Sequence, residues 1–299
     1  MMGLDELAAY ADVTGMTLLA ALAALGLLVG ILSGLFGVGG GFLMVPLLSM
    51  LVGMDYSLAV GSGLAATIGT GTAGLARHRR LENVELRTAI AMAAGSVVGV
   101  VLGDMLHQCL RASLAGPRGQ LAPFDRTMDA IFIAMLSVTA WVAWRGPRAH
   151  HSGRTPLQRL AVGPHIDLPQ AGLKGVSLPG LCVVGLGVGV LTGLLGVGGG
   201  VLFVPVLLSL VGLSAHQAVG TSLGVVLVAS IAGTVKKGLD EGQISLLVAM
   251  ALLVGSTVGV QIGAAVCDRL HATKLRRYFA LLVVLVIVML AARFIIRIT

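Results

Sequence analysis

Two short glycine runs are the residues of this sequence whose types and spacing could do chemistry. Gly37–Gly41 reads GVGGG and is followed by Pro46, and Gly196–Gly200 reads GVGGG again and is followed by Pro205. Inside a helix, glycine costs about 1 kcal/mol relative to alanine, and proline costs about 3 kcal/mol. Each run with its proline therefore predicts a break in helical structure.

A helix that starts directly after either run would expose backbone amides. Its first N–H groups have no intrahelical partner, and the helix dipole places about half a positive charge at that end. Such an end binds oxyanions, and glycine lets a ligand approach the backbone closely. Hydroxyls occupy matching positions in the two halves of the chain. We therefore predict an anion-binding site composed of Ser33, Gly37, Gly39, Gly40, Gly41, Ser62, Thr192, Gly196, Gly198, Gly199, Gly200 and Thr221.

A structural interpretation competes with this one. Small residues also permit close helix crossings in membranes, and membrane Ser and Thr hydroxyls often bond their own backbone. We prefer packing for two rows of glycines at four-residue spacing, and an anion site for the glycine runs. The two rows are Gly95, Gly99 and Gly103, and Gly255, Gly259 and Gly263.

Charged side chains lie at the ends of apolar stretches. Arg77 and His78 end one stretch, and Lys236 and Lys237 end its counterpart. These four residues could attract an anion or could simply anchor helices, and both readings stay open. Asp104 and Asp129 are expected near the ends of their stretches, so the carboxylate relay of many proton-driven pumps is not visible.

Enzymatic and metal-binding motifs do not fit the sequence. The glycine runs lack the Lys-Ser/Thr of a phosphate-binding loop. Cys109, Cys182 and Cys267 have neither CxxC spacing nor an even count. We therefore expect no catalytic residues, no metal site and no cofactor.

The composition points to a membrane protein. Of 299 residues, 57% are hydrophobic and 11% are charged, whereas soluble domains carry about 25% charged residues. The net charge of +7 comes from Lys and Arg between apolar stretches, where they set orientation in a membrane. We therefore expect a lipid bilayer and a small anion as partners, and no nucleic acid. A homodimer stays an open alternative.

Eight apolar stretches are long enough to be membrane-spanning helices, since a span needs roughly 20 apolar residues. Phe42–Val52 and Val201–Val211 are too short to cross as ideal helices. The chain is thus predicted to be an all-α polytopic membrane protein. The eight stretches are Met16–Ser33, Ser57–Ala76, Thr88–Leu106, Ala130–Trp144, Val176–Leu195, Leu213–Val235, Ile244–Cys267 and Tyr278–Ile296.

The chain matches itself at an offset of 159 residues. Gly30–Gly53 aligns with Gly189–Gly212, and 16 of those 24 positions are identical. We therefore predict a first transmembrane repeat over residues 1–145, an extended, exposed linker rich in Pro, Arg and His over 146–174, and a second repeat over 175–299. Each repeat has four full spans and one glycine-broken segment.

The direction of the glycine-broken segments decides the topology. If they re-enter without crossing, the chain crosses eight times and the repeats are parallel; if they cross, it crosses ten times and the repeats are inverted. Of the 20 Lys and Arg residues, 13 fall on the cytoplasmic side in either arrangement. We favour inverted repeats, because they set two broken segments facing each other near the midplane.

The duplicated GxxGVGGGxxxVPxL pattern, which begins at Gly34 and again at Gly193, resembles the sulfite exporter TauE/SafE family of membrane transporters. The resemblance implies transport of sulfite or small organosulfonates such as sulfoacetate across the bacterial inner membrane. We therefore expect a multi-pass secondary transporter that works by alternating access. An anion channel and a non-transporting structural or assembly component are the alternatives.

Overall fold

The computed structural model describes residues 4–114, 122–145, 155–160, 162–196, 198–241 and 244–296. In that part of the chain, eight helices are long and apolar enough to cross a membrane, which confirms a polytopic membrane protein that is nearly all helical. The first half contains α1 (Leu4–Phe36), α2 (Gly41–Leu51), α3 (Tyr56–Arg80), α4 (Leu86–Leu114) and α5 (Ala122–Arg145). The second half contains α7 (Leu178–Leu195), α8 (Gly200–Val206) with the π-helical turn η1 (Leu207–Val211), α9 (Ala215–Glu241), α10 (Leu246–Arg269) and α11 (Ala272–Ile296).

The helix α4 extends further than the sequence predicted. Its apolar stretch was expected to end at Leu106, but the helix continues to Leu114. Asp104 therefore lies well inside α4 and is buried, rather than near the end of the span.

The described part of the linker is folded rather than extended. It contains the one-turn helix α6 (Pro156–Arg159) and an antiparallel hairpin of β1 (His165–Leu168) and β2 (Leu173–Ser177). Arg87 Nη1 donates a hydrogen bond of 2.8 Å to the Asp167 carbonyl, and the Glu85 carboxylate accepts one of 3.1 Å from Gln170 N. The hairpin is thereby fixed to the start of α4. Residues 146–154 and 161 of the predicted linker lie outside the described residues.

The two halves of the molecule interlock. The most extensive helix contacts join α1 to α10 and α4 to α7, so each half packs its first helix against the other half. A Cβ on any glycine of the two predicted packing rows would collide with facing backbone, which confirms their packing role. The facing carbonyls are those of Cys182, Leu186 and Val190 for the α4 row, and of Ala23, Leu27 and Ile31 for the α10 row.

Contacts in register reveal the direction of each helix. Gly26 and Gly34 of α1 face Leu252 and Val260 of α10, so these two helices run parallel. The helix α3 also runs parallel to α10, because Ser62 contacts Ser245 at one end and Gly74 faces Val260 towards the other. Since α1 and α3 run in the same direction, the chain between them, which contains α2, must return across the molecule.

Register contacts also give the directions of α7 and α9 in the second half. Along α9, Gly224 and Gly233 face Ala89 and Val100 of α4, and α7 is likewise parallel to α4. In contrast, α3 is antiparallel to α9, because the residue numbers of the contacts rise along α3 while they fall along α9. These contacts pair Leu64 with Gly233, Gly71 with Leu227, and Gly74 with Leu223.

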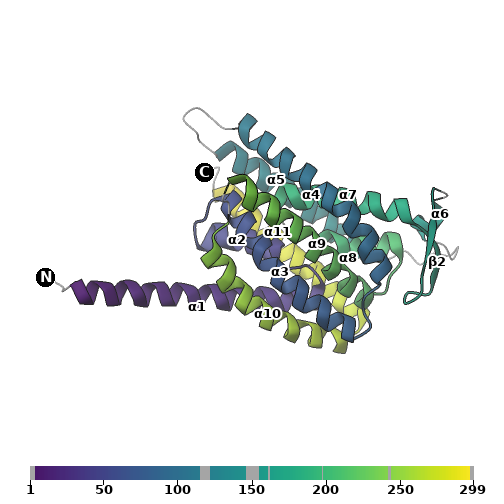
Figure 1. Cartoon of the computed structure of the whole chain (residues 1–299), viewed down its shortest axis with the longest axis horizontal. Coiled ribbons are helices and arrows are strands. Elements are labelled where there is room, and N and C mark those ends of the chain that lie inside the picture. Colours follow the sequence, from purple (N-terminus) through teal and green to yellow (C-terminus); the bar gives the residue numbers. More distant parts are fainter. Residues whose placement is uncertain are drawn as a thin grey trace.

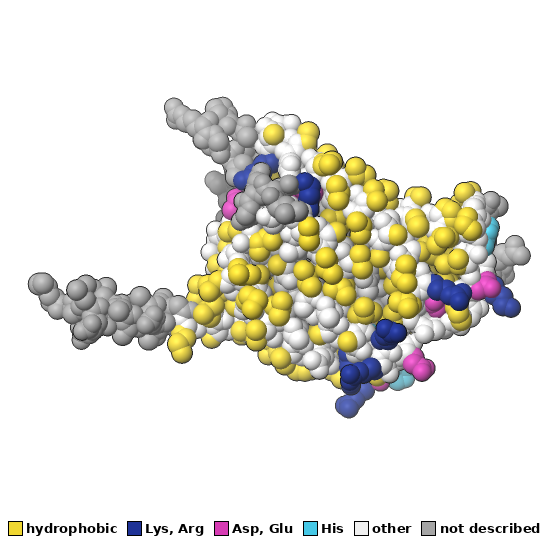
Figure 2. Space-filling model, viewed as in Figure 1, with side chains coloured by type: hydrophobic (Ala, Val, Ile, Leu, Met, Phe, Trp, Pro, Cys, Tyr) yellow, Lys and Arg dark blue, Asp and Glu magenta, His cyan; other side chains and the backbone are white. Residues whose placement is uncertain are grey.

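Most helices run obliquely across the view in Figure 1, with both chain ends at one end of the molecule and the β-hairpin at the other. Figure 2 shows apolar side chains spread across the middle of this face, while Lys and Arg gather towards the two ends. This distribution suits a protein whose middle faces lipid and whose ends face water.

Candidate functional site

The two glycine runs form matching backbone turns. Gly37, Gly39 and Gly40 have φ angles of 72°, 75° and 82°, and Gly196, Gly198 and Gly199 have angles of 67°, 71° and 73°. Residues with a Cβ rarely adopt this left-handed conformation, whereas glycine does so without steric cost. The runs therefore need glycine to turn the chain from α1 into α2 and from α7 into α8.

The structure brings the two runs together. A Cβ on Gly200 would collide with the backbone of Val38, so the second run lies directly against the first. Thr67 of α3 touches both runs, because its Cγ2 lies 3.3 Å from the Cβ position of Gly39 and 3.5 Å from that of Gly198. Val226, its counterpart on α9, also contacts both. The crossing of α3 and α9 thus marks the place where the runs meet.

Each short helix begins at the last glycine of its run. The N–H groups of Leu43 and Met44 both donate 3.0 Å hydrogen bonds to the Gly40 carbonyl, and Leu202 and Phe203 donate to Gly199 in the same way. The N–H groups just before these, on residues 41 and 42 and on residues 200 and 201, precede the internal bonding of their helices. These amides are the positive helix ends that the sequence predicted.

Hydroxyls surround the meeting point of the runs. Ser230 and Ser33 are 0% and 1% exposed, and neither Oγ has a hydrogen-bond partner among the described residues. Ser230 Oγ lies 3.8 Å from the Cβ position of Gly198. Thr70 donates a 3.2 Å hydrogen bond to the Gly39 carbonyl, and the Thr192 hydroxyl contacts Gly199. Ser230 is therefore a buried hydroxyl with free hydrogen-bonding capacity beside the second run, and Ser33 is another on α1, where its carbonyl accepts a hydrogen bond from Gly37 N.

Ser62 and Thr221 occupy a different position. Ser62 Oγ accepts a 2.9 Å hydrogen bond from Ser245 N, and Thr221 Oγ1 accepts one of 2.9 Å from Glu85 N. The residues with these amides stand directly before α10 and α4. Ser62 and Thr221 each lie five residues from the helix crossing, or about 7.5 Å along the axis. Their hydroxyls support the start of a helix in the other half.

Four polar side chains hold the helix ends that lead into the runs, and only His78 among them was a predicted candidate, as a residue that could attract an anion or anchor a helix. His78 Nε2 donates a 3.0 Å hydrogen bond to the Gly34 carbonyl of α1, and His107 Nδ1 donates one of 2.8 Å to the Leu194 carbonyl of α7. Tyr56 donates to the Leu195 carbonyl at 3.2 Å, and Ser222 donates to the Gly37 carbonyl at 2.7 Å. Polar residues in strongly apolar spans were the sequence signal for them.

The four predicted charged residues differ in how deeply they are buried. Lys237 Nζ lies 2.7 Å from Asp104 Oδ1, and these side chains are 3% and 2% exposed. Gln108 Nε2 donates a 3.0 Å hydrogen bond to the other carboxylate oxygen. His78 is fully buried, while Arg77 and Lys236 are half-buried. Lys237 and His78 are therefore held by internal partners rather than exposed to solvent.

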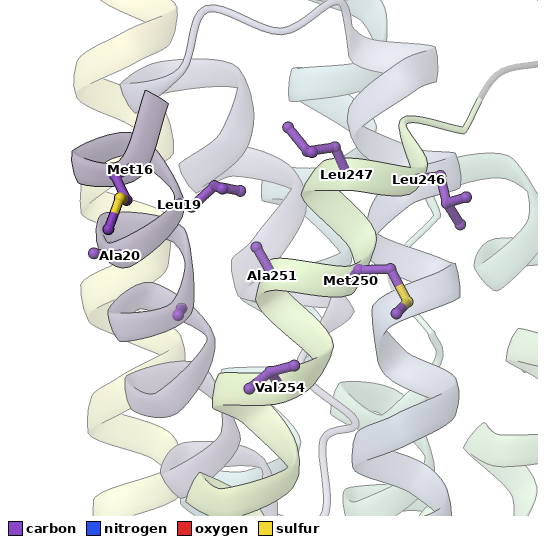
Figure 3. Close-up of a pocket in the computed structure, with 9 residues that line it drawn as sticks. Met16, Leu19, Ala20, Leu246, Leu247, Met250, Ala251 and Val254 are labelled. Carbon is purple, nitrogen blue, oxygen red and sulfur yellow. The ribbon is translucent and has the colours of Figure 1, made fainter. Parts of the chain in front are cut away.

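A large hollow elsewhere has the wrong chemistry for an anion. It has a volume of about 820 Å³ and lies between α1 and α10, where every lining side chain is apolar (Figure 3). Met16 and Leu19 come from α1, and Leu246, Leu247 and Met250 come from α10. Since these side chains offer no hydrogen-bond donor, the glycine runs remain the candidate site.

Comparison with known proteins supports the resemblance seen in the sequence. The family described as "Sulfite exporter TauE/SafE" matches residues 22–290. The chain is 24% identical to the "Probable membrane transporter protein YunE" of Bacillus subtilis, over 89% of this chain and 94% of that protein. It is 25% identical to the "Probable membrane transporter protein MJ0441" of Methanocaldococcus jannaschii, over 84% of this chain and 89% of that protein. No solved structure matches the chain significantly. With its eight candidate spans, the chain is a multi-pass protein of the bacterial inner membrane.

Proposed function

The chain belongs to the sulfite exporter TauE/SafE family of membrane transporters, and from this premise we propose that it is a secondary transporter of small sulfur-containing anions. Sulfite, sulfoacetate and related organosulfonates are the expected substrates. The observation that carries the proposal is the convergence of the two glycine runs where α3 crosses α9. This convergence supports one site to which both halves of the chain contribute.

In this proposal the substrate is held by neutral donors. The amides at the starts of α2 and α8 supply partial positive charge, and the free hydroxyls of Ser33 and Ser230 supply directional hydrogen bonds. A sulfite or sulfonate group presents three oxygens to such donors. Lys237 is not assigned a substrate contact, because Asp104 already neutralises its charge.

We further propose that the halves are inverted repeats and that the chain crosses the membrane ten times. In support, α1 and α3 are parallel to each other, and α3 is antiparallel to its counterpart α9. Inverted repeats place the binding segments near the midplane, and motion of one repeat against the other opens the site to each side in turn. This gives alternating access.

The charge distribution supports one orientation. In the ten-crossing arrangement, 13 Lys and Arg and four acidic residues of the sequence fall on the membrane side of the hairpin, and seven basic and nine acidic residues fall on the other side. Because positive loops stay in the cytoplasm, the hairpin end is cytoplasmic and both chain ends are outside.

Transport into proteoliposomes tests the proposal. Uptake of radiolabelled sulfite should saturate and should be accelerated by sulfite inside the vesicles. Ser230→Ala should raise the sulfite KM about tenfold, as expected for loss of one hydrogen bond to a charged ligand. Thr221→Val is the matched control and should leave KM unchanged.

Other outcomes would decide against parts of the proposal. Flux that does not saturate and shows no exchange would indicate an anion channel. Absence of flux, together with no thermal stabilisation by any tested anion, would indicate a structural or assembly component, because a ligand that binds the folded state must stabilise it. Equal KM values for the two variants would reject the site at Ser230.

A further inference from the structure

A second hollow lies where α5 ends beside the start of α11. Its volume is about 510 Å³, and it is distinct from the glycine runs and from the apolar hollow of Figure 3. Unlike the apolar hollow, it combines cationic, aromatic and aliphatic side chains. The lining residues are Ala143, Trp144, Arg276, Arg277, Tyr278, Ala280 and Leu281.

The cationic side chains of this hollow have free binding capacity. Within the described ranges, neither Arg276 nor Arg277 makes a hydrogen bond or an ion pair. A third guanidinium is nearby on α5, where Arg145 stacks over the Trp141 ring with 4.0 Å between its Cζ and the ring centroid. No carboxylate is among the lining residues. The hollow therefore concentrates uncompensated positive charge.

Exposed apolar side chains continue from the hollow along both helices. On α11, Tyr278, Leu281, Leu285 and Val288 are all exposed, and their spacing of three or four residues places them on one face. On α5, Val138, Trp141 and Trp144 are exposed at a spacing of three. Aromatic residues of this kind lie at the level of lipid headgroups. Below the arginines, the surface is thus suited to hydrocarbon.

We propose that this hollow is a binding site for an anionic phospholipid. Its phosphate lies against Arg276 and Arg277, and its acyl chains lie along the exposed stripes of α5 and α11. A basic pocket between membrane helices at the cytoplasmic end is the kind of site that binds anionic headgroups. The assignment to the cytoplasmic leaflet rests on the orientation proposed above, whereas the site itself does not. A free phosphate ion would match the charges and leave the apolar stripes unused.

Lipid binding to the full-length protein tests this proposal. The purified, delipidated protein is titrated with phosphatidylglycerol in detergent, and bound lipid is counted by native mass spectrometry. Arg276→Gln/Arg277→Gln should weaken binding about 25-fold, as the product of about fivefold for each arginine. Arg79→Gln/Arg80→Gln removes two exposed arginines from the same end of the molecule and should change affinity less than twofold.

Further arms separate the possible ligands. Phosphatidylcholine, whose headgroup has no net charge, should bind at least tenfold more weakly than phosphatidylglycerol. Inorganic phosphate alone should give no thermal stabilisation. The single variant Arg277→Gln alters an exposed side chain and should still weaken binding about fivefold if the double variant does not fold. Unchanged phosphatidylglycerol affinity in the Arg277→Gln variant would overturn the proposal, and so would equal losses of affinity in the two double variants. Thermal stabilisation by inorganic phosphate equal to that by phosphatidylglycerol would also overturn it.

Discussion

Lys237 Nζ lies 2.7 Å from Asp104 Oδ1, and this buried ion pair joins α9 of the second half to α4 of the first. The matching positions of the repeat do not contain a second pair of this kind. The residue that matches Lys237 in the first half is His78, and the residue that matches Asp104 in the second half is Ala264. His78 instead donates a hydrogen bond to the Gly34 carbonyl. The two ends of the molecule are therefore held by different chemistry despite the repeat in the sequence.

Removing one partner of this pair should destabilise the protein strongly. Asp104→Asn leaves the Lys237 ammonium buried without its counter-charge, and we expect a loss of about 3–5 kcal/mol in the free energy of unfolding. The double variant Asp104→Asn/Lys237→Met removes both charges and should recover most of this loss. Unfolding of each protein in detergent measures the effect. Equal loss in the single and double variants would contradict this account of the pair.

Adding a methyl group to a glycine of either row should lower the stability of the protein. Gly99→Ala would place a Cβ against the Leu186 carbonyl, and we expect it to lower stability by about 1–3 kcal/mol. Gly187→Ala is the matched control on α7, because nothing lies within 4 Å of its Cβ position. Since alanine is the better helix former, the control should be neutral or up to about 1 kcal/mol more stable. Melting temperatures compare the two variants, and a neutral Gly99→Ala would count against close packing of α4 and α7.

The two helix-start hydroxyls should matter for stability and not for substrate affinity. Thr221→Val removes the acceptor for Glu85 N and should lower stability by about 1 kcal/mol, the usual effect of losing such a cap. Thr221→Ser keeps the acceptor and should be nearly neutral. Thermal unfolding with and without sulfite separates the two effects. A lower degree of sulfite stabilisation in Thr221→Val alone would return this residue to the substrate site.

The proposed ten-crossing topology can be tested by labelling single cysteines. Cys109, Cys182 and Cys267 are first replaced by serine or alanine, and one cysteine is then introduced at Ser113 or Thr273, both of which are exposed. In intact cells, an impermeant maleimide should label Ser113→Cys and should label Thr273→Cys only after permeabilisation.

An eight-crossing chain with parallel repeats gives a different pattern. There, both positions face outward and both label in intact cells. That result would reject inverted repeats, while labelling of Thr273→Cys alone would reverse the proposed orientation. Neither labelling pattern tests whether the glycine runs bind substrate.

The spans were predictable because their apolar length is a local property of the sequence. The stretch Val176–Leu195, for example, corresponds to α7 over Leu178–Leu195. The turns at the glycine runs were equally accessible, since only glycine adopts their left-handed backbone freely. The start of a helix after each run follows from the same local reasoning.

The pairing of the halves was not accessible from sequence. A repeat shows which segments are alike, but it does not show that α1 packs on α10 rather than within its own half. The β-hairpin was missed for a related reason, because it depends on Arg87 and Glu85, which lie some 80 residues before it.

The comparison of repeats also hid two residues that line the meeting point of the runs. Thr67 matches Val226, and Ser230 matches Gly71, so a search for hydroxyls shared by both halves excluded them. The same search selected Ser62 and Thr221, whose shared hydroxyls support helix starts.

The interlocking of α1 with α10 and of α4 with α7 also governs how the protein is made. The helix α1 ends at Phe36, and its partner begins about 210 residues later, at Leu246. At roughly 5–20 residues per second, synthesis leaves α1 without its partner for about 10–40 seconds. During that interval its small-residue face is open to any other helix in the bilayer. Cellular yield should therefore depend on the speed of translation through the second half of the chain as well as on the stability of the finished fold.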